Sequence, residues 1–247
     1  MARCSEFRKR LVDGEQIVGT FLKTPSPIVA EVLALSDLDA VCIDVEHAPF
    51  GRLELDSCIA ALRAADCPSI VRVANDSSSE IRNALDSGAT GILVPHVTNA
   101  EEAAAIVKAA HFGEGGRGYA GSTRAASYTR KPMANHLSDS RSQTTVIVQI
   151  EDLAALPNVR EIASVAGIDA IFIGRIDLAV AMNKMPADTA VVDAVRTVCA
   201  ETTAGGTAVG MFTADLGEIP MWREAGSSLF LLGSDHSFML AGANELA

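Results

Sequence analysis

The sequence predicts an α/β protein built as a closed (β/α)8 barrel, and three observations support this. Short segments rich in Val, Ile and Leu alternate with Ala-rich segments from one end of the 247-residue chain to the other. The first kind consists of nearly continuous apolar runs, which are typical of parallel strands covered on both faces. Eight such units in about 250 residues match the usual size of one barrel. No Pro-, Ser- or Gly-rich linker divides the chain, so we expect residues 1–247 to form a single domain.

Each element of this pattern has its own signal. The eight predicted strands are residues 17–23, 40–46, 69–73, 91–95, 145–151, 170–175, 208–213 and 228–233. The eight predicted helices are residues 26–36, 55–65, 78–87, 100–111, 157–166, 189–204, 218–225 and 237–246. Ser77 and Glu80 have the spacing of a capping box, and Gly88 follows the expected end of the same helix. An open doubly wound sheet is the alternative, but the first turn, Lys23-Thr24-Pro25-Ser26, lacks the glycines that such a sheet usually has there.

One connection is much longer than the others. About thirty residues separate the predicted helix 100–111 from the strand that begins at Thr145, and they include five glycines and five basic residues. Loops of this length inside a compact domain are usually functional or poorly ordered. The segment 113–118, Gly-Glu-Gly-Gly-Arg-Gly, lacks both the spacing and the position of a dinucleotide-binding turn.

Charge and composition exclude several classes of partner. Twenty Lys and Arg residues against 31 Asp and Glu residues give a formal net charge of −11, so we expect neither nucleic acid nor a membrane as a partner. No apolar run approaches the length of a membrane-spanning helix, and the N-terminus lacks the apolar core of a secretion signal. The five cysteines are odd in number and form no C-x-x-C pair. These features predict a cytoplasmic protein with reduced thiols.

Polar residues that end apolar strands carry the functional information, because the active site of such a barrel lies at the carboxyl ends of its strands. They are Asp44, Glu46 and His47 after the second strand, Arg72 in the third, Gln149 and Glu151 in the fifth, and Gly174, Arg175, Ile176 and Asp177 after the sixth. Glu151 and Asp177 offer hard oxygen ligands on neighbouring strands, which suits Mg²⁺ or Mn²⁺. Arg72 is flanked by valines and is costly to bury without an anionic or carbonyl partner.

Each of these residues also has a purely structural interpretation. Asp177 could cap a helix, and His47 could be a hydrogen-bonded structural histidine. Arg72 could form an ion pair with Asp44 or Glu46. Because all of them are expected on one rim with complementary chemistry, the set favours a functional site.

The same residues form a known pattern. The motifs occur in order along nearly the whole chain: Asp44-x-Glu46-His47, Val71-Arg72-Val73, Leu85-Asp86-x-Gly88, Gly91-x-Leu-Val-Pro95, Gln149-Ile-Glu151 and Phe172-Ile-Gly174-x-x-Asp177-Leu178. In this set the sequence resembles the HpcH/HpaI aldolase family of metal-dependent, pyruvate-specific class II aldolases. The family includes aldolases for 4-hydroxy-2-oxoheptanedioate and 2-dehydro-3-deoxyglucarate and, more distantly, carbon–carbon lyases of the citrate lyase β type. The resemblance implies a TIM barrel of the phosphoenolpyruvate/pyruvate type.

The resemblance also implies a role for each matching residue. Glu151 and Asp177 would bind a divalent cation (Mg²⁺, Mn²⁺ or Co²⁺) that chelates pyruvate, and Arg72 would stabilise the enolate. His47, oriented by Asp44 and by Asp86, would act with water at the metal as the acid/base group on the aldol hydroxyl. The remaining predicted substrate-binding residues are Gln149, Gly174, Arg175, Ile176 and Asp177, and the backbone N–H groups of the turn 174–177 would hold the carboxylate of pyruvate.

One residue departs from the family pattern. Arg175 stands where the family usually has Pro, and its guanidinium could point into the site as an extra anion clamp or outward into solvent. The implied partners are a small 2-oxoacid and an aldehyde, with the chain as a homo-oligomer, a hexamer arranged as a trimer of dimers. We expect the acceptor pocket to be formed by Phe21, residues 48–52 and residues 117–130, with a neighbouring subunit as a further contributor.

Three other functions stay open. A Schiff-base aldolase needs a lysine at a strand end, and Lys23 is the one lysine near such a position. A catalytically weak 2-oxoacid-binding barrel is the second alternative. The third is a CoA-thioester lyase of the citrate lyase β type, although the sequence has no evident additional basic site for the phosphates of CoA.

Overall fold

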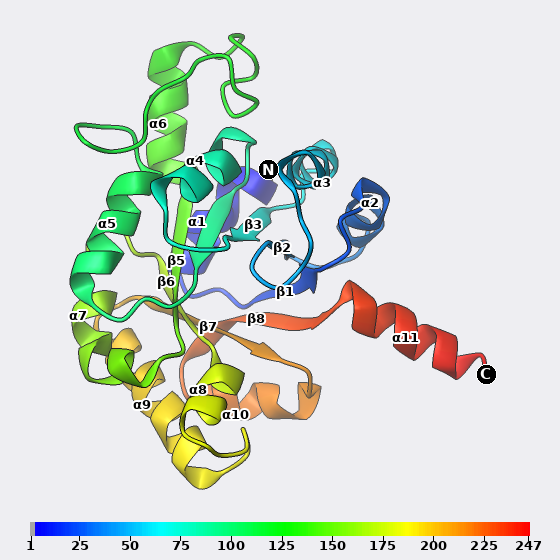
Figure 1. The fold of residues 1–247 in the computed structure, drawn as a ribbon, viewed down its shortest axis with the longest axis vertical. Coiled ribbons are helices and arrows are strands. Elements are labelled where there is room, and N and C mark those ends of the chain that lie inside the picture. The colour runs from blue at the N-terminus through cyan, green and yellow to red at the C-terminus, as the bar shows by residue number, and fades with distance from the viewer. Residues whose placement is uncertain (1–2) are drawn as a thin grey trace.

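The computed structural model describes residues 3–247, which form a closed barrel of eight parallel strands (Figure 1). The strands are β1 Ile17–Leu22, β2 Ala40–Asp44, β3 Ser69–Arg72, β4 Gly91–Val94, β5 Thr145–Ile150, β6 Ala170–Ile173, β7 Ala208–Thr213 and β8 Ser227–Ser234. Each strand pairs in parallel with its sequence neighbours, and β8 pairs with β1 to close the barrel. The predicted fold class and all eight predicted strands are confirmed.

Helices surround the barrel on its outer side. They are α1 Arg3–Val12, α2 Pro27–Ala34, α3 Arg52–Ala64, α4 Ser78–Asp86, α5 Ala100–Ala110, α6 Met133–Gln143, α7 Val159–Ala163, α8 Arg175–Ala181, α9 Thr189–Ala204, α10 Ile219–Glu224 and α11 Asp235–Glu245, with 3-10 turns η1 Leu153–Asn158 and η2 Leu216–Glu218. Helix α11 extends away from the barrel (Figure 1). In the described part of the chain, no helix combines the length and the apolar character needed to cross a membrane.

Local signals explain why several helices begin where they do. The side chain of Ser77 accepts a hydrogen bond from the backbone N–H of Glu80 at the start of α4, as the sequence predicts. Ser26 caps α2 and is followed by Pro27, whose missing N–H costs nothing in the first turn. Pro157 lies in a 3-10 turn, so the predicted helix 157–166 is a turn followed by the short helix α7.

Three helices were not predicted. Helix α1 has only two buried residues, Phe7 and Leu11, and is otherwise polar, so its apolar periodicity is weak. Helix α6 lies inside the long 111–144 connection and buries only His136. Helix α8 has seven residues and follows β6 after the single residue Gly174, so it merges with the strand in an apolar sequence.

The core has two apolar layers separated by the strand backbones. One layer joins the outward-facing strand residues to the helices, and the other fills the barrel interior. Phe7 and Leu11 of α1 belong to the interior layer, together with Ile17, Cys42 and Leu93. Helix α1 therefore closes the amino-terminal end of the barrel and leaves the carboxyl end of the strands for the site.

The Phe7→Ala variant tests the role of α1. Phe7 is fully buried, so its truncation should lower the free energy of unfolding by about 3–5 kcal/mol, as expected for a buried aromatic ring. Urea titration followed by circular dichroism measures the change. Lys9→Ala, on the exposed face of the same helix, is the matched control and should be nearly neutral; equal effects of the two variants would show that α1 does not close the barrel.

Candidate active site

A cavity of about 550 Å³ opens at the carboxyl ends of the strands. Its apolar wall includes Phe21 of β1, Phe172 of β6 and Phe212 of β7. The polar groups that face it include Lys23, His47, Arg72, Gln149 and Asp177. An apolar cavity with a few converging polar groups is the usual form of a small-molecule site, and this one brings together most of the predicted site residues.

Arg72 and Asp44 form a buried ion pair beneath this cavity. Arg72 Nε lies 3.0 Å from Asp44 Oδ1 and Arg72 Nη2 lies 2.8 Å from Asp44 Oδ2, which is a two-pronged contact. The backbone N–H of His47 donates to Asp44 Oδ1 at 3.2 Å, and Lys23 Nζ lies 3.2 Å from Asp44 Oδ2. Burial alone would raise the pKa of Asp44, but these partners outweigh it and hold the pKa below its usual value. Asp44 is therefore ionised and fixes the guanidinium.

Glu46 connects three cationic or imidazole groups at the rim. Its side chain is only 9% exposed, and Oε2 lies 3.4 Å from Arg72 Nε and 3.5 Å from His47 Nε2. Oε1 lies 3.4 Å from His96 Nε2. The ring of His47 is thus placed next to Glu46, whereas Asp44 bonds to the backbone N–H of His47 and not to its ring in the described structure. Asp44 positions the turn that carries His47, and the ring itself is 54% exposed at the mouth of the cavity.

Glu151 is a buried carboxylate directly after β5, with a side chain that is only 3% exposed. It accepts hydrogen bonds from the side chain of Gln149 and, at 2.9 Å, from the backbone N–H of His96. Burial raises the pKa of Glu151, and the nearby charge of Asp177 adds to this effect. Asp177 lies exposed in the first turn of α8, and Glu151 directly follows β5. The predicted pair of carboxylates is therefore close enough to interact.

The residues around Glu151 fit a divalent cation. Gln149 Oε1 is buried and has no hydrogen-bond partner in the described structure, so an unsatisfied oxygen lies beside the two carboxylates. A Cβ on Gly174 would lie 2.6 Å from Glu151 Cβ and 2.8 Å from Glu151 Oε2, so only glycine leaves the carboxylate its place. The donors are hard oxygens, which Mg²⁺ and Mn²⁺ prefer.

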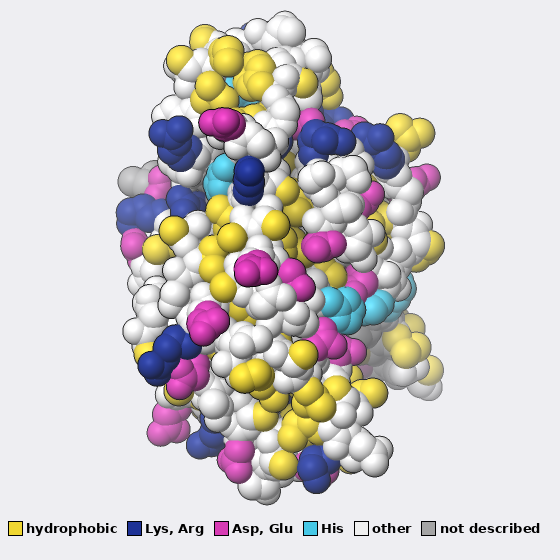
Figure 2. All heavy atoms as spheres, turned by 60° about the vertical axis from the view of Figure 1, so that its left-hand side comes forward, with side chains coloured by type: hydrophobic (Ala, Val, Ile, Leu, Met, Phe, Trp, Pro, Cys, Tyr) yellow, Lys and Arg dark blue, Asp and Glu magenta, His cyan; other side chains and the backbone are white. Residues whose placement is uncertain are grey.

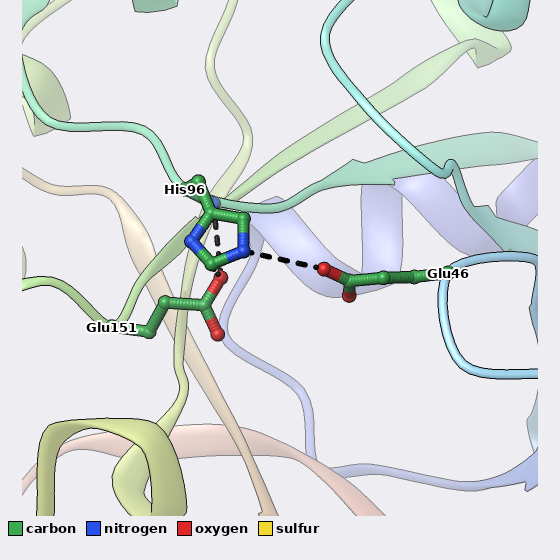
Figure 3. A group of neighbouring side chains, drawn as sticks. All are labelled: Glu46, His96 and Glu151. Atoms are coloured by element: carbon green, nitrogen blue, oxygen red, sulfur yellow. Dashed lines mark hydrogen bonds and ion pairs between the residues drawn. The ribbon is translucent and has the colours of Figure 1, made fainter. Parts of the chain in front are cut away.

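His96 is a site residue that the sequence did not reveal. It follows β4 and Pro95 and adopts a positive φ of 58°, which is uncommon for histidine. Its ring lies between Glu46 and Glu151, with Nδ1 3.3 Å from Glu151 Oε1 (Figure 3). Each of the three side chains offers one donor atom, and these atoms lie within 4.8 Å of one another, so the group could hold a metal ion. Figure 2 shows histidine side chains beside acidic ones on the face it draws. The backbone conformation of this loop brings His96 to the site. A single histidine in a loop sequence gives no indication of that conformation.

Comparison with known proteins places this geometry in a family. Residues 17–241 match HpcH/HpaI aldolase/citrate lyase. The chain belongs to this family. It is 38% identical to a 4-hydroxy-2-oxovalerate aldolase of Rhodococcus jostii (strain RHA1) over 215 residues, 85% of this chain and 81% of that protein. It is 30% identical to a hydroxypyruvate/pyruvate aldolase of Paraburkholderia phytofirmans over 248 residues, 96% of this chain and 94% of that protein.

A solved structure agrees with this assignment. A HpcH/HpaI aldolase/citrate lyase family protein from Burkholderia cenocepacia J2315 superposes with a TM-score of 0.92 at 32% identity, covering 98% of this chain and 97% of that chain. The resemblance predicted from the sequence motifs is thereby confirmed. The protein is an enzyme of the carbon–carbon lyase class.

Within one chain, the structure does not place Asp86 at the carboxyl end of the barrel, where the other predicted site residues lie. Asp86 is the last residue of α4, shortly before β4 begins, so it lies towards the amino-terminal end of the barrel. Its carboxylate accepts a hydrogen bond from Arg117 Nε at 3.1 Å. Arg124 pairs with Asp56 of α3, so the 117–130 segment packs outside helices α3 and α4. Within the described residues of one chain, the 550 Å³ cavity is lined by Phe21, as predicted, but not by this segment or Asp86.

Arg175 is buried and lines the cavity, so it does not point outward into solvent. Its Nη2 lies 2.6 Å from Glu218 Oε2, and its guanidinium carbon lies 5.4 Å from the centre of the Trp222 ring. This contact lowers the pKa of Glu218, so the pair is ionised. Arg175 therefore links the turn after β6 to the segment after β7 through Nη2, while its Nε is buried without a hydrogen-bond partner in the described structure.

Replacing Arg72 with Ala should leave Asp44 buried without its main partner. We expect the free energy of unfolding at pH 7 to fall by about 3–5 kcal/mol, the range for a broken buried pair. The native pKa of Asp44 is lowered, so the stability of the pair is fully present above the unfolded pKa of about 3.9 and is lost as the pH falls through the native pKa. The difference in the free energy of unfolding between the wild type and the variant should therefore become smaller at low pH.

Urea titrations at several pH values measure this deficit. The double variant Arg72→Ala/Asp44→Asn is the control, since it removes the unpaired charge and should recover part of the loss. A deficit that stays constant from neutral to acidic pH would contradict the ion pair as the source of the stability.

Proposed function

We propose that this protein is a divalent-metal-dependent class II aldolase that cleaves or forms 4-hydroxy-2-oxoacids. Pyruvate or a hydroxylated pyruvate is the enolate donor, and an aldehyde is the acceptor. The observation that carries the proposal is that Arg72 and Asp177 line one cavity and that Glu151 lies beside it, bonded to the cavity residue Gln149 and close enough to Asp177 to feel its charge. The names of the relatives from Rhodococcus jostii and Paraburkholderia phytofirmans support the same chemistry.

Glu151 and Asp177 are the proposed ligands of the cation. When bound, a divalent ion supplies Lewis-acid polarisation of the carbonyl group of the 2-oxoacid. Gln149 and the backbone N–H of His96 hold the Glu151 carboxylate in place for this task. Mg²⁺, Mn²⁺ and Co²⁺ are the candidate ions.

Arg72 stabilises the negative charge that develops on the enolate oxygen. Asp44 holds Nε and Nη2, and Nη1 has no hydrogen-bond partner among the described residues, so this N–H group stays available to the substrate. A donor fixed in advance costs no reorganisation during the reaction. The N–H groups of the first turn of α8, which have no acceptors within the helix, are proposed to hold the carboxylate of the donor, next to Gly174 and Ile176.

His47 is the proposed acid/base group for the aldol hydroxyl. Its ring lines the mouth of the cavity, where an acceptor aldehyde enters, and Glu46 lies 3.5 Å from Nε2. An imidazole in this position can give up or receive the hydroxyl proton as the carbon–carbon bond forms or breaks.

The alternative Schiff-base mechanism is disfavoured by the surroundings of Lys23. A lysine nucleophile must lose its proton, which desolvation or a neighbouring cation favours. Lys23 Nζ instead lies 3.2 Å from the carboxylate of Asp44, so it faces an anion and neither a cation nor an apolar pocket. Two alternatives remain, a CoA-thioester lyase and a barrel that binds 2-oxoacids without turnover. A substrate screen distinguishes both from an aldolase.

The homo-oligomer predicted for the chain is also part of this proposal. Helix α11 projects from the barrel (Figure 1) and exposes Phe238, Met239 and Leu240. Exposed apolar side chains on a projecting helix support contact with another copy of the chain. A hexamer, as a trimer of dimers, and a cytoplasmic location remain predictions.

A retro-aldol screen tests the proposed reaction directly. Purified protein is mixed with a panel of 4-hydroxy-2-oxoacids, and pyruvate release is followed with a coupled lactate dehydrogenase assay. Metal-dependent release from at least one of the panel is expected. Lack of release from every compound, together with cleavage of a CoA thioester, would favour the citrate lyase alternative.

Removal of metal should abolish turnover. Exhaustive treatment with EDTA is expected to stop pyruvate release, and added Mn²⁺, Co²⁺ or Mg²⁺ should restore it, because the carboxylate pair leaves the ion exchangeable. Glu151→Gln and Asp177→Asn should lose metal binding, measured by calorimetry, while circular dichroism shows a folded barrel. Full activity in the EDTA-treated protein would rule out a class II mechanism.

Substitution of Arg72 and of His47 should affect different steps. Arg72→Lys should lower both cleavage and exchange of the methyl protons of pyruvate with deuterium by roughly 100- to 1,000-fold, since both pass through the enolate. His47→Asn should lower cleavage much more than exchange. Proton NMR of pyruvate in D2O and the coupled assay give the two rates; equal losses in the His47 variant would remove its separate role.

A further inference from the structure

His96 is a potential metal donor that the mechanism proposed above does not use. Its ring is 61% exposed, whereas Glu46 and Glu151 on either side of it are nearly buried. Its backbone N–H already binds Glu151, so the loop after β4 is fixed with the ring over that carboxylate (Figure 3). The ring therefore lies where an ion held by Glu151 could reach it.

The charges around the ring favour a cation. Glu46, Glu151 and Asp152 all lie within 3.4 Å of a ring nitrogen, and Asp177 lies close enough to Glu151 for the two charges to interact. Arg72 Nε lies 3.4 Å from Glu46 Oε2, but the two short hydrogen bonds of this guanidinium go to Asp44. The four carboxylates therefore have little positive charge to balance them. Such an arrangement is stable when a divalent ion supplies the missing positive charge.

The distances agree with ligands of one ion. Neighbouring ligands at about 2.1 Å from a cation and at right angles to each other are roughly 3 Å apart. His96 Nδ1 lies 3.3 Å from Glu151 Oε1, close to this separation. The other ring nitrogen, Nε2, faces Glu46 Oε1 at 3.4 Å. Metal-bound histidines usually donate their second N–H to a carboxylate in this way.

We propose that His96 Nδ1 is a third protein ligand of the divalent ion, beside Glu151 and Asp177, with Glu46 accepting the Nε2–H. This inference rests on the metal site of the proposed function. Asp152 Oδ2 also lies 3.1 Å from Nδ1. Its carboxylate is 42% exposed, so it can turn into solvent when the nitrogen binds an ion.

A nitrogen ligand changes which metal the site selects. Imidazole binds Mn²⁺ and, more strongly, Co²⁺, whereas Mg²⁺ prefers oxygen ligands and keeps its waters. We expect affinity to rise from Mg²⁺ to Mn²⁺ to Co²⁺. Loss of the imidazole should reduce the affinity for Co²⁺ and Mn²⁺ by about 10- to 100-fold and change that for Mg²⁺ much less.

Pulsed electron paramagnetic resonance of the Mn²⁺-loaded full-length protein tests the assignment, because a coordinated imidazole nitrogen gives a distinct ¹⁴N coupling. The main variant is His96→Gly, since glycine adopts the positive φ at this position and keeps the backbone N–H on Glu151. His236→Asn is the matched control, because this rim histidine bonds to Thr24 and does not belong to the group formed by Glu46, His96 and Glu151. Calorimetry gives the metal affinities of each protein.

The expected result is a ¹⁴N coupling in the wild type and in His236→Asn that disappears in His96→Gly. Added ¹⁵N-imidazole should enter the space left by the exposed ring and restore a nitrogen coupling at the ¹⁵N frequency. A coupling that persists in His96→Gly, or Mn²⁺ bound by the wild type without any coupling, would overturn the role of His96 and leave the proposed function intact. Failure of the wild type to bind Mn²⁺, Co²⁺ or Mg²⁺ would overturn both.

Discussion

The concentration of carboxylates at one end of the barrel is the constraint on which the rest of the site depends. Asp44 ends β2, Glu46 and Glu151 follow β2 and β5, and Asp177 lies in the first turn of α8, so the strand order brings them to one rim. Charge buried without a partner is costly, and each carboxylate needs a cation or hydrogen-bond donor. Arg72 satisfies Asp44, and Glu151 is left with a raised pKa beside Asp177. The site is therefore arranged for a further cation.

The two ends of the barrel have opposite character for the same physical reason. Helix α1 places Phe7 and Leu11 against the interior residues, so the amino-terminal end is closed by apolar contacts. The carboxyl end has no such cover; phenylalanines line the lower wall and charged groups line the rim. A rigid, apolar lower barrel holds the strand ends in place, which is what fixed catalytic geometry requires.

Strand ends are predictable from this sequence because apolar runs and the polar residues that end them are adjacent. Asp44, Arg72 and Glu151 were assigned to the rim on that basis; Asp44 and Arg72 end β2 and β3, and Glu151 directly follows β5. Asp86 ends a helix instead of a strand, and helices run in the opposite direction, so its motif marks the other end of the barrel. The partner of Arg175, Glu218, lies 43 residues away, and nothing local indicates such a pairing.

His96 shows the same limit more clearly. A histidine after Pro95 in a loop has no local signal, and its position depends on a positive φ and on a hydrogen bond to a residue 55 positions away.

The central claim is that the carboxylate-rich rim binds a divalent ion that in turn holds a 2-oxoacid. Calorimetry of pyruvate binding with and without saturating Mn²⁺ tests this claim most directly. The account predicts at least a tenfold tighter dissociation constant with Mn²⁺, and an equal reciprocal gain for Mn²⁺ with pyruvate. Equal pyruvate affinity in both conditions would contradict it.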